Sequence, residues 1–452
     1  MTRPPALIAH DQALRTLRAQ LVAQPDGSPI RLAKPTSNLF RFREPPPANA
    51  LDVSAFTGVL HVDPRERVAE VGGMTTYEDL VDATLPHGLM PTVVPQLKTI
   101  TIGGAVAGLG IESTSFRAGM PHEAVLELEI LTPDGEVVLA RPDNEHSALF
   151  YGFPNSYGTL GYALRLRISL TPTRPFVALR HLRYPDAASC AAAITELAAD
   201  PGVDFLDGTA FSGEELYLTV GRFTDSAPRL SDYTGRHIYY RSVRERVEDH
   251  LTARDYLWRW DTDWFWCSQA LGAQHPLVRR LWPRRYLRSD VYRRIVALDR
   301  RFGLSARVDR LLGNPAREPV IQDIEVPVER LAEFLEFFDT EIGIRPVWLC
   351  PVTLREPRGW PLYPMPPGRM FVNVGFWATV PLRPGQPEGH HNRLIESRVT
   401  ELGGHKSLYS DSYFTEDEFW LRYDGETYRE LKETYDPRGR LPDLYAKCVG
   451  NR

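Results

Sequence analysis

KTITIGGAVAGLGIESTS, residues 98–115, places glycine and alanine between two groups of hydroxyl side chains. Glycine lets a backbone approach a ligand closely and leaves main-chain N–H groups able to face an anion. The flanking threonine and serine hydroxyls are short donors suited to phosphate oxygens. We therefore predict a loop that holds the pyrophosphate of a dinucleotide. The alternative is a glycine-rich turn between buried strands.

Two common phosphate-binding motifs are excluded by the spacing of these glycines. The stretch contains no G-x-x-x-x-G-K-[ST], so it is not a Walker A loop. It also lacks G-x-G-x-x-G at the start of a helix, which excludes the Rossmann fingerprint. A dinucleotide held here must be bound in another way.

A second glycine motif, Gly158-Thr159-Leu160-Gly161, favours the dinucleotide hypothesis. Residues 162–168 follow it with the alternation of a half-buried strand. Between the motifs lie an acidic and apolar strand, residues 126–131, and the turn Thr132-Pro133-Asp134-Gly135. The pairing T-I-G-G … G-T-L-G, with a strand and a turn between, resembles the FAD-binding domain of the vanillyl-alcohol-oxidase/PCMH flavoprotein family.

Longer matching runs narrow the resemblance to the delta-24 sterol reductase (Seladin/Diminuto) branch of that family. The runs are GGAVAGLGIESTSFRAG (103–119), Phe150-Tyr151, YGTLG (157–161), VIQD (320–323), VWLCP (347–351), LYSDSY (408–413) and EFW (418–420). Each run alone is weak, but together they cover most of the chain from about Leu51 onward.

The resemblance implies an α+β fold with a PCMH-type FAD-binding domain made of two α/β subdomains. At 452 residues the chain is long enough for two domains. We predict the FAD-binding domain over residues 1–175, ending at a proline-marked linker, and a mixed-sheet substrate (cap) domain over 176–400. A helical C-terminal segment, 401–452, is expected to return to the flavin.

Local signals predict several individual elements. Residues 8–23 read as an amphipathic helix, and residues 50–73 as a strand–turn–strand unit. Thr75 is expected to cap a helix from Thr76 to about His87. Thr415-Glu416-Asp417-Glu418 has the form of a capping box at the start of another helix.

The resemblance places FAD contacts on both glycine motifs and on a loop after the first strand. In some relatives a His or Cys in that loop bonds the flavin covalently, but residues 31–60 contain neither, so we expect dissociable FAD. The alternative for the loop is a solvated turn started by Pro35. The expected FAD-binding residues are Lys34, Thr36, Ser37, Asn38, Thr99, Thr101, Ile102, Gly103, Gly104, Gly108, Gly110, Ile111, Glu112, Ser113, Ser115, Gly158, Thr159, Leu160 and Gly161.

Composition restricts the classes of partner and compartment. An apolar fraction of 43% supports a real core, and a net charge of −5 argues against a nucleic-acid binder. The four cysteines lie far apart without C-x-x-C, so we expect no metal site and no disulfide framework, in a reducing cytoplasm. The sequence shows no signal peptide and no membrane span, unlike the anchored sterol reductases of eukaryotes. Any membrane contact is therefore expected to be peripheral, on the inner face of the cell membrane.

Residues 256–301 begin with a cluster of tryptophans and continue with nine arginines and two aspartates in residues 279–301. Tryptophan favours the membrane interface and arginine is attracted to anionic headgroups, so this segment is a candidate membrane-surface segment. The alternative is a solvated helical face packed on an aromatic core.

The C-terminal segment supplies candidates for a catalytic acid. Tyr409, Asp411 and Tyr413 are two residues apart in sequence, so on a strand all three would face one site. The alternative is a tyrosine-rich edge strand. Glu112, His122 and His405 are the next candidates.

The resemblance implies reduction of an isolated carbon–carbon double bond. Such an alkene has no carbonyl to accept charge, so we expect protonation to a tertiary cation, then hydride from flavin N5, with water excluded. The arginine- and proline-rich composition is typical of high-GC bacteria, where cholesterol-type biosynthesis is uncommon. The family that the chain resembles includes an actinobacterial 10-methylene fatty-acyl reductase, so we favour a phospholipid-linked 10-methylene fatty-acyl chain reduced to 10-methyl (tuberculostearate type). The resemblance implies NADPH as donor and an acyl methyltransferase as pathway partner.

Three rival functions remain open. The first is the same chemistry on a sterol or isoprenoid side chain. The second is an alcohol or sugar oxidase or dehydrogenase that passes electrons to O2 or a quinone. The third is a flavin-free lipid-binding protein.

Overall fold

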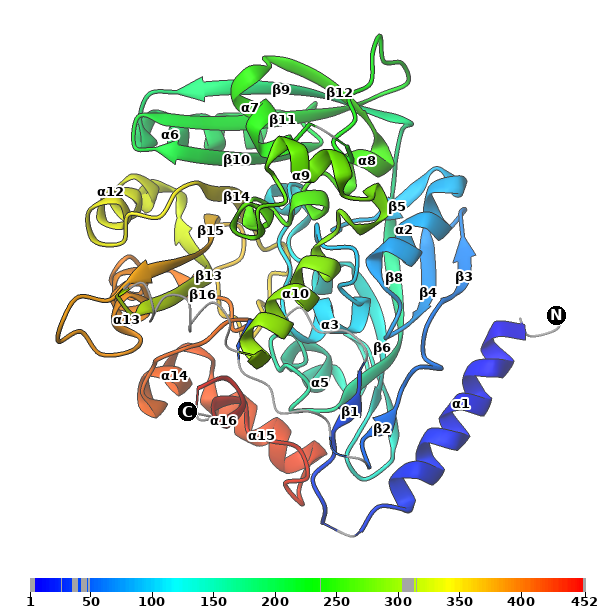
Figure 1. Cartoon of the computed structure of the whole chain (residues 1–452). Helices are drawn as coiled ribbons and strands as arrows, with labels where there is room; N and C mark the ends of the chain where they lie inside the picture. Colours follow the sequence, from blue (N-terminus) through cyan, green and yellow to red (C-terminus); the bar gives the residue numbers. More distant parts are fainter. Residues whose placement is uncertain are drawn as a thin grey trace.

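The computed structural model describes residues 5–25, 27–34, 40–41, 47, 49–235, 237–302, 313 and 315–449. Two large β-sheets with helices around them dominate these residues, which confirms the predicted α+β class (Figure 1). The expected FAD-binding residues Thr36, Ser37 and Asn38 lie outside the described residues.

The first sheet is antiparallel and lies in the N-terminal half of the chain. Its strands are, in spatial order, β3 (Val59–Asp63), β4 (Val68–Gly72), β8 (Tyr162–Pro172), β6 (Val125–Leu131) and β7 (Val137–Ala140), with β5 (Leu89–Pro91) paired to the end of β8. The predicted strands at 126–131 and 162–168 are thus confirmed, and β8 extends further than expected because its alternation of buried and half-buried residues continues.

Three helices of this part accompany the sheet: α2 (Tyr77–Thr84), α3 (Ile102–Ala107) and α5 (Ser147–Gly152). The N-cap of α2 is Thr76, one residue after the predicted Thr75. Thr76 accepts the N–H of Asp79 at 3.1 Å, whereas the hydroxyl of Thr75 donates to the Gly72 carbonyl at 2.6 Å. Thr75 therefore closes the turn before the helix.

The N-terminal helix α1 (Pro5–Val22) packs on the outer side of the first sheet. It buries Leu17 and Leu21, and His10 Nε2 lies 2.6 Å from Glu129 Oε1 of β6. The chain then forms the short parallel pair β1 (Leu32–Ala33) and β2 (Leu51–Asp52).

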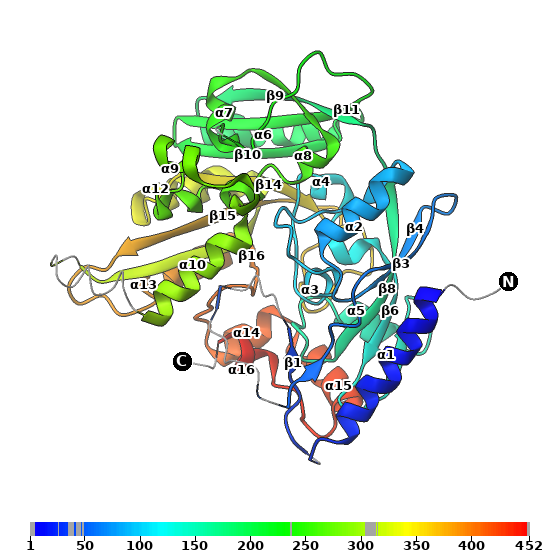
Figure 2. The same cartoon turned by 45° about the vertical axis from the view of Figure 1, so that its right-hand side comes forward.

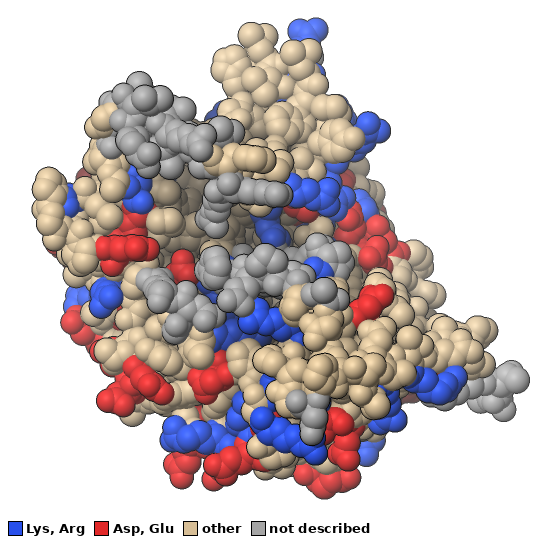
Figure 3. Space-filling model, turned by 60° about the horizontal axis from the view of Figure 1, so that its bottom comes forward, with Lys and Arg blue, Asp and Glu red and all other residues tan. Residues whose placement is uncertain are grey.

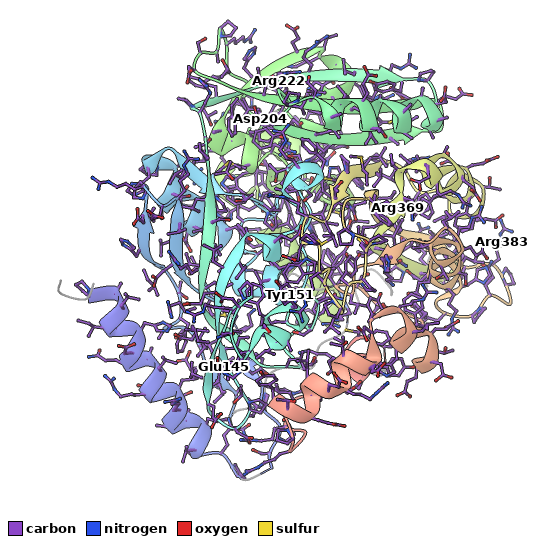
Figure 4. All side chains as sticks on the ribbon, turned by 180° about the vertical axis from the view of Figure 1, so that it is seen from behind. Glu145, Tyr151, Asp204, Arg222, Arg369 and Arg383 are labelled. Atoms are coloured by element: carbon purple, nitrogen blue, oxygen red, sulfur yellow. The ribbon has the colours of Figure 1, made fainter. Side chains whose placement is uncertain are left out.

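The second sheet begins at Phe176, four residues after β8 ends at Pro172. Its spatial order is β12 (Glu248–Thr252), β9 (Phe176–Tyr184), β11 (Glu215–Thr224), β10 (Phe205–Ser212), β14 (Val347–Thr353), β15 (Met370–Pro381), β13 (Arg317–Pro327) and β16 (His405–Lys406). We expected mixed strand directions, but every pair in this sheet is antiparallel. Seen from behind, Asp204 and Arg222 lie on this upper layer, and Glu145 lies in the lower part of the molecule (Figure 4).

The expectation of helices on one face of the second sheet is wrong, because α7 (Tyr239–Glu245) and α8 (Ala253–Leu257) pack on the other face, against β11 and β9. Three longer helices cover the first face. These are α6 (Ala187–Ala199), α12 (Leu331–Glu341) and α13 (His390–Glu401), and they share a core with alternate residues of the strands, such as Leu349 and Ile324 (Figure 2). The intervening residues, such as Trp348 of β14, join the core of the first sheet instead. The face of β14 and β15 opposite these three helices is therefore turned toward the N-terminal half.

The C-terminal helices are α14 (Glu416–Arg422), α15 (Gly425–Tyr435) and α16 (Leu444–Cys448). The predicted capping box is confirmed, because Thr415 and Glu418 bond each other's backbone N–H groups. Lys432 of α15 donates to the Thr159 carbonyl at 2.9 Å, so this segment contacts the second glycine motif. Among the described residues, no helix combines the length and apolar character needed to cross a bilayer.

Candidate active site

The two glycine motifs lie side by side and are hydrogen-bonded to each other. The N–H of Asn155 donates to the Gly108 carbonyl at 3.1 Å, and the N–H of Tyr157 donates to the Ala107 carbonyl at 2.7 Å. Gly161 has φ +133°, and a Cβ there would lie 2.8 Å from the Leu131 carbonyl oxygen. The second motif thus needs glycine both for its backbone conformation and for its close approach to β6.

Residues 102–107 of the first motif form the short helix α3, where we predicted an open loop, and residues 108–112 are irregular. The first N–H groups of α3 are already bonded: Ile102 to the Thr75 carbonyl, Gly103 to the Gly73 carbonyl and Gly104 to the Thr101 hydroxyl. The expectation of N–H groups that face an anion is therefore wrong for these three residues. A Cβ on Gly103 would lie 2.6 Å from the Gly73 carbonyl oxygen, so this glycine permits two backbone segments to meet.

A cavity of about 370 Å³ lies between the glycine motifs and strands β13, β14 and β15 of the second sheet. This volume is within the usual range for cofactor sites, roughly 300–1,000 Å³. A space-filling view shows the surface hollowed on one face, with basic side chains beside the hollow (Figure 3).

The cavity wall includes many, but not all, of the expected FAD-binding residues. Those that line it are Lys34, Thr99, Thr101, Gly103, Gly104, Gly108, Gly110, Ile111, Gly158 and Gly161. Those that are buried beside it without lining it are Ile102, Glu112, Ser113, Ser115, Thr159 and Leu160. The sequence pattern marked the right segments, whereas the direction of each side chain depends on the fold around it.

Positive charge is concentrated in the cavity wall. Four basic residues line it, namely Arg31, Lys34, Arg41 and Lys447. The guanidinium of Arg41 lies 4.6 Å from the centre of the Tyr157 ring, and Lys447 donates to the Tyr157 carbonyl at 2.6 Å. Asp323 is the single acidic side chain among the described lining residues. This charge balance suits a ligand with a dianionic pyrophosphate.

Two phenylalanines and three tryptophans also line the cavity, namely Phe40, Phe265, Trp264, Trp348 and Trp377. Phe40 stacks on Trp264 at 5.5 Å between ring centres, and Phe265 stacks on Trp377 at 4.3 Å. We refer to this set as the aromatic wall. An apolar wall of this kind suits a hydrocarbon chain and excludes water.

The aromatic wall corrects the prediction for residues 256–266. The tryptophans at 258, 260, 264 and 266 are all buried in the core, so they are not part of an exposed membrane-facing cluster. Trp264 and Phe265 also adopt left-handed backbone conformations, with φ of +48° and +59°. Such conformations cost of order 1–3 kcal/mol each and persist only where the surroundings enforce them.

Asp323 and Tyr409 form the polar centre of the cavity. The Tyr409 hydroxyl bonds to the Asp323 carboxyl, Asn373 Nδ2 donates to Asp323 Oδ1 at 3.2 Å, and Trp377 Nε1 donates to the Tyr409 hydroxyl at 3.0 Å. Burial raises the pKa of Asp323 to about 7 and that of Tyr409 well above its usual value. Near pH 7 the Asp323 carboxyl is therefore about half protonated, so a large fraction of it carries a proton within the cavity.

Sequence reasoning missed Asp323 as a functional residue, although VIQD was one of the matching runs. The available signal was the spacing of Asp323 and Glu325, which alternate with the apolar residues Ile324 and Val326. Residues two apart on a strand share a face, and β13 turns both carboxyls away from the helix-covered core.

Glu325 is a second buried carboxyl beside the cavity. It accepts a short hydrogen bond from the Tyr363 hydroxyl and another from Ser407 Oγ at 3.4 Å, and Ser407 lines the cavity. Burial, with a smaller contribution from Asp323, raises the pKa of Glu325 to about 8.

Asp411 and Tyr413 do not converge with Tyr409 on one site. Residues 409–413 form a bend and an irregular segment, so the prediction of a strand with three polar residues on one face is wrong. The backbone N–H of Tyr413 donates to the Glu396 carboxylate at 3.1 Å, away from the cavity wall. Of the three, only Tyr409 lines the cavity.

Glu112, His122 and His405 also lie outside the cavity wall. His122 packs edge-on against Trp360 at 4.5 Å, and burial lowers its pKa to about 3. His405 lies on β16, and burial lowers its pKa to about 4. Both imidazoles are therefore neutral near pH 7, and neither has the position that a proton donor in this cavity requires.

Glu112 belongs to a buried ion cluster between the two sheets. Arg259 Nη2 lies 3.4 Å from Glu112 Oε1 and 2.9 Å from Asp207 Oδ2 of β10. The indole N–H groups of Trp260 and Trp348 also donate to Asp207, at 3.2 and 3.1 Å. Burial raises the pKa of Glu112 to about 6. This cluster fixes the segment after the first glycine motif against the second sheet.

Comparison with known proteins agrees with this geometry. Residues 22–141 match the family model described as an FAD binding domain. The chain contains a PCMH-type FAD-binding domain. It is 27% identical to the Delta(24)-sterol reductase of Homo sapiens over 410 residues, covering 86% of this chain and 75% of that protein.

Two further relatives agree with an oxidoreductase. The Delta(24)-sterol reductase of Pisum sativum is 27% identical over 445 residues, covering 89% of this chain and 76% of the relative. Cytokinin dehydrogenase 7 of Oryza sativa subsp. japonica is 33% identical over 166 residues, covering 36% of this chain and 31% of the relative. Together with the FAD-binding domain, they identify an FAD-dependent oxidoreductase.

The residues present fit an FAD. Lys34, Arg41 and Lys447 offer positive charge to a pyrophosphate. A side chain at Gly103 or Gly161 would collide with a neighbouring backbone carbonyl, so glycine is needed at both positions of the cavity wall. When bound, FAD supplies two-electron hydride chemistry, while the protein supplies orientation, a proton and exclusion of water.

Proposed function

We propose that this enzyme reduces an isolated carbon–carbon double bond in a lipid chain and uses NADPH as the electron donor. The observation that carries the proposal is the Asp323 carboxyl, with its pKa raised to about 7, on the wall of a cavity that also has an aromatic wall. The similarity to two Delta(24)-sterol reductases over most of the chain supports the same class of reaction.

An isolated alkene needs a proton because it has no carbonyl to accept negative charge. Asp323 holds that proton on its carboxyl, and Tyr409 and Asn373 orient the carboxyl by hydrogen bonds. Protonation of the less substituted alkene carbon leaves a tertiary cation, which then accepts a hydride. The aromatic wall excludes the water that would otherwise trap this cation.

Two lipid classes fit this chemistry, and they differ in the alkene. A 10-methylene fatty-acyl chain has a 1,1-disubstituted double bond, and a sterol side chain has a trisubstituted one, but both give a tertiary cation on protonation. We propose the methylene acyl chain of a phospholipid as the substrate. The sterol side chain is the second candidate, because two of the relatives carry that activity in their names.

An anaerobic flavin assay tests the proposal. NADPH is expected to bleach the yellow protein under argon, and a 10-methylene phospholipid is expected to restore the colour and to gain two hydrogens, as mass spectrometry would show. Restoration by a Δ24 sterol alone would move the assignment to the second candidate. Bleaching by an alcohol or sugar, without recovery on either alkene, would contradict alkene reduction and indicate an oxidase or dehydrogenase.

A further inference from the structure

We propose that helices α9 (Pro276–Leu281) and α10 (Ser289–Phe302), with the turn η5 (Arg284–Tyr286) between them, dock on an anionic phospholipid bilayer. We call these elements the docking surface. Figures 1 and 2 both place α9 and α10 on the same side of the molecule, one above the other. The proposal deepens the proposed function, because it names the partner from which a lipid substrate would enter.

Large apolar side chains of the docking surface face solvent. Leu277 and Leu281 are four residues apart on α9, and Leu281 is 83% exposed. Leu298 and Phe302 are four residues apart on α10 and are both more than half exposed. Because residues four apart share a helix face, each helix presents an apolar pair to its surroundings.

The docking surface is rich in arginine: residues 276–302 contain nine arginines and two aspartates, in a chain whose net charge is −5. Arg279 is buried on Asp263 and Arg288 is paired with Glu78, so these two are turned inward. Arg280 and Arg285 are exposed. Arg294 is also exposed, and it lies four residues before Leu298, on the same face of α10 as Leu298 and Phe302. Exposed apolar side chains among arginines complement a bilayer with anionic headgroups, since the apolar groups enter the interface and the arginines meet phosphate.

The docking surface is joined to the cavity wall through the turn η3 (Asp261–Asp263). Arg279 Nη2 lies 2.9 Å from Asp263 Oδ2, Ser289 Oγ donates to Asp261 Oδ1 at 2.6 Å, and the Tyr292 hydroxyl donates to the Thr262 carbonyl at 3.1 Å.

The two residues that follow this turn, Trp264 and Phe265, line the cavity in left-handed conformations. A bilayer bound to α9 and α10 is therefore connected to the aromatic wall by one short, hydrogen-bonded turn.

Vesicle co-sedimentation tests the docking surface without any turnover. Wild-type holoprotein is expected to sediment with phosphatidylcholine vesicles that contain phosphatidylglycerol and not with phosphatidylcholine alone, and high salt should release it. The double variant Arg280→Glu/Leu281→Ser is expected to partition at least about tenfold more weakly. Leu421→Ser and Val22→Ser are matched controls, because those side chains are 86% and 84% exposed on other helices.

Two results would overturn the proposal. One is equal binding to neutral and anionic vesicles, or unchanged binding by the double variant. The other is a dimer of the wild type that the double variant loses, which would assign the face to a second copy of this chain. Turnover of substrate in detergent micelles separates this test from the proposed function. The rate of turnover in micelles should be the same in the double variant and in wild type. If the proposed function were wrong, wild type itself would show no turnover of the alkene.

Discussion

The indole N–H of Trp377 donates to the hydroxyl oxygen of Tyr409 at 3.0 Å. This bond occupies the hydroxyl as an acceptor and leaves its O–H to bond the Asp323 carboxyl. Trp377 and Asp323 come from the adjacent strands β15 and β13, and Tyr409 comes from the segment after β16. The orientation of the proposed acid therefore depends on three segments that are far apart in sequence.

The rate of alkene reduction should fall as pH rises through about 7. Only the protonated Asp323 carboxyl donates a proton, and burial raises its pKa to about 7, so the active fraction is high below that pH and falls about tenfold per unit well above it. Stopped-flow measurement of alkene-dependent flavin reoxidation at several pH values would check this. A rate that rises through the same range would contradict the assignment of Asp323 as acid.

Gly375→Ala should reduce activity while leaving the FAD in place. Gly375 is opposite Asp323 in the sheet, and a Cβ there would lie 2.5 Å from Asp323 Oδ1 and 2.7 Å from the Trp377 ring. Overpacking of this kind costs about 1–3 kcal/mol and would displace the carboxyl. The measurement is kcat with bound flavin counted by absorbance. Gly213→Ala is the control and should keep wild-type kcat, because Gly213 lies in the hairpin between β10 and β11 and a Cβ there would meet only the end of the Asp339 side chain, at 3.1 Å.

We expect FAD to bind without a covalent bond, and we expect the affinity for FAD to depend on Lys447. Acid precipitation is expected to release the yellow colour into the supernatant; colour retained in the pellet would show a covalent bond.

Lys447→Met removes the bond that holds the Tyr157 carbonyl, so FAD affinity should weaken about tenfold or more by titration of the apoprotein. Arg438→Gln, on an exposed side chain of the same C-terminal segment, should bind FAD as wild type does.

Arg259→Met should destabilise the protein more than an ordinary core substitution. The change leaves Glu112 and Asp207 buried without their shared cation, and breaking a buried pair in this way costs about 3–5 kcal/mol. Chemical denaturation would measure the loss. The triple change Arg259→Met/Glu112→Gln/Asp207→Asn removes the uncompensated charges and should recover part of it. A single variant with wild-type stability would contradict the role given to the cluster.

Local patterns in the sequence predicted much of the fold. The alternation of residues 162–168 marked β8, and Thr415 with Glu418 marked the start of α14. The glycine motifs correctly predicted the position of the cavity. The helix α3 was not predicted, because its first N–H groups bond to Thr75, Gly73 and Thr101, and two of these partners belong to the turn before α2.

The acid was harder to predict because its environment is built from distant segments. Tyr409 was a candidate, but its supposed partners Asp411 and Tyr413 lie on irregular backbone that leads away from the cavity. Asp323 acquires its role only through burial beside Tyr409 and Trp377. The tryptophans of residues 256–266 were ambiguous for a similar reason, because composition does not show whether an indole faces lipid or the core.

The most direct test compares the two half-reactions of Asp323→Asn with those of wild type under argon. We predict that NADPH bleaches the flavin of both proteins at similar rates. A methylene phospholipid should then reoxidise the flavin of the variant about 10²–10⁴ times more slowly than that of wild type, because the proton donor is missing. Reoxidation of the variant at the wild-type rate would contradict the claim that Asp323 protonates the alkene.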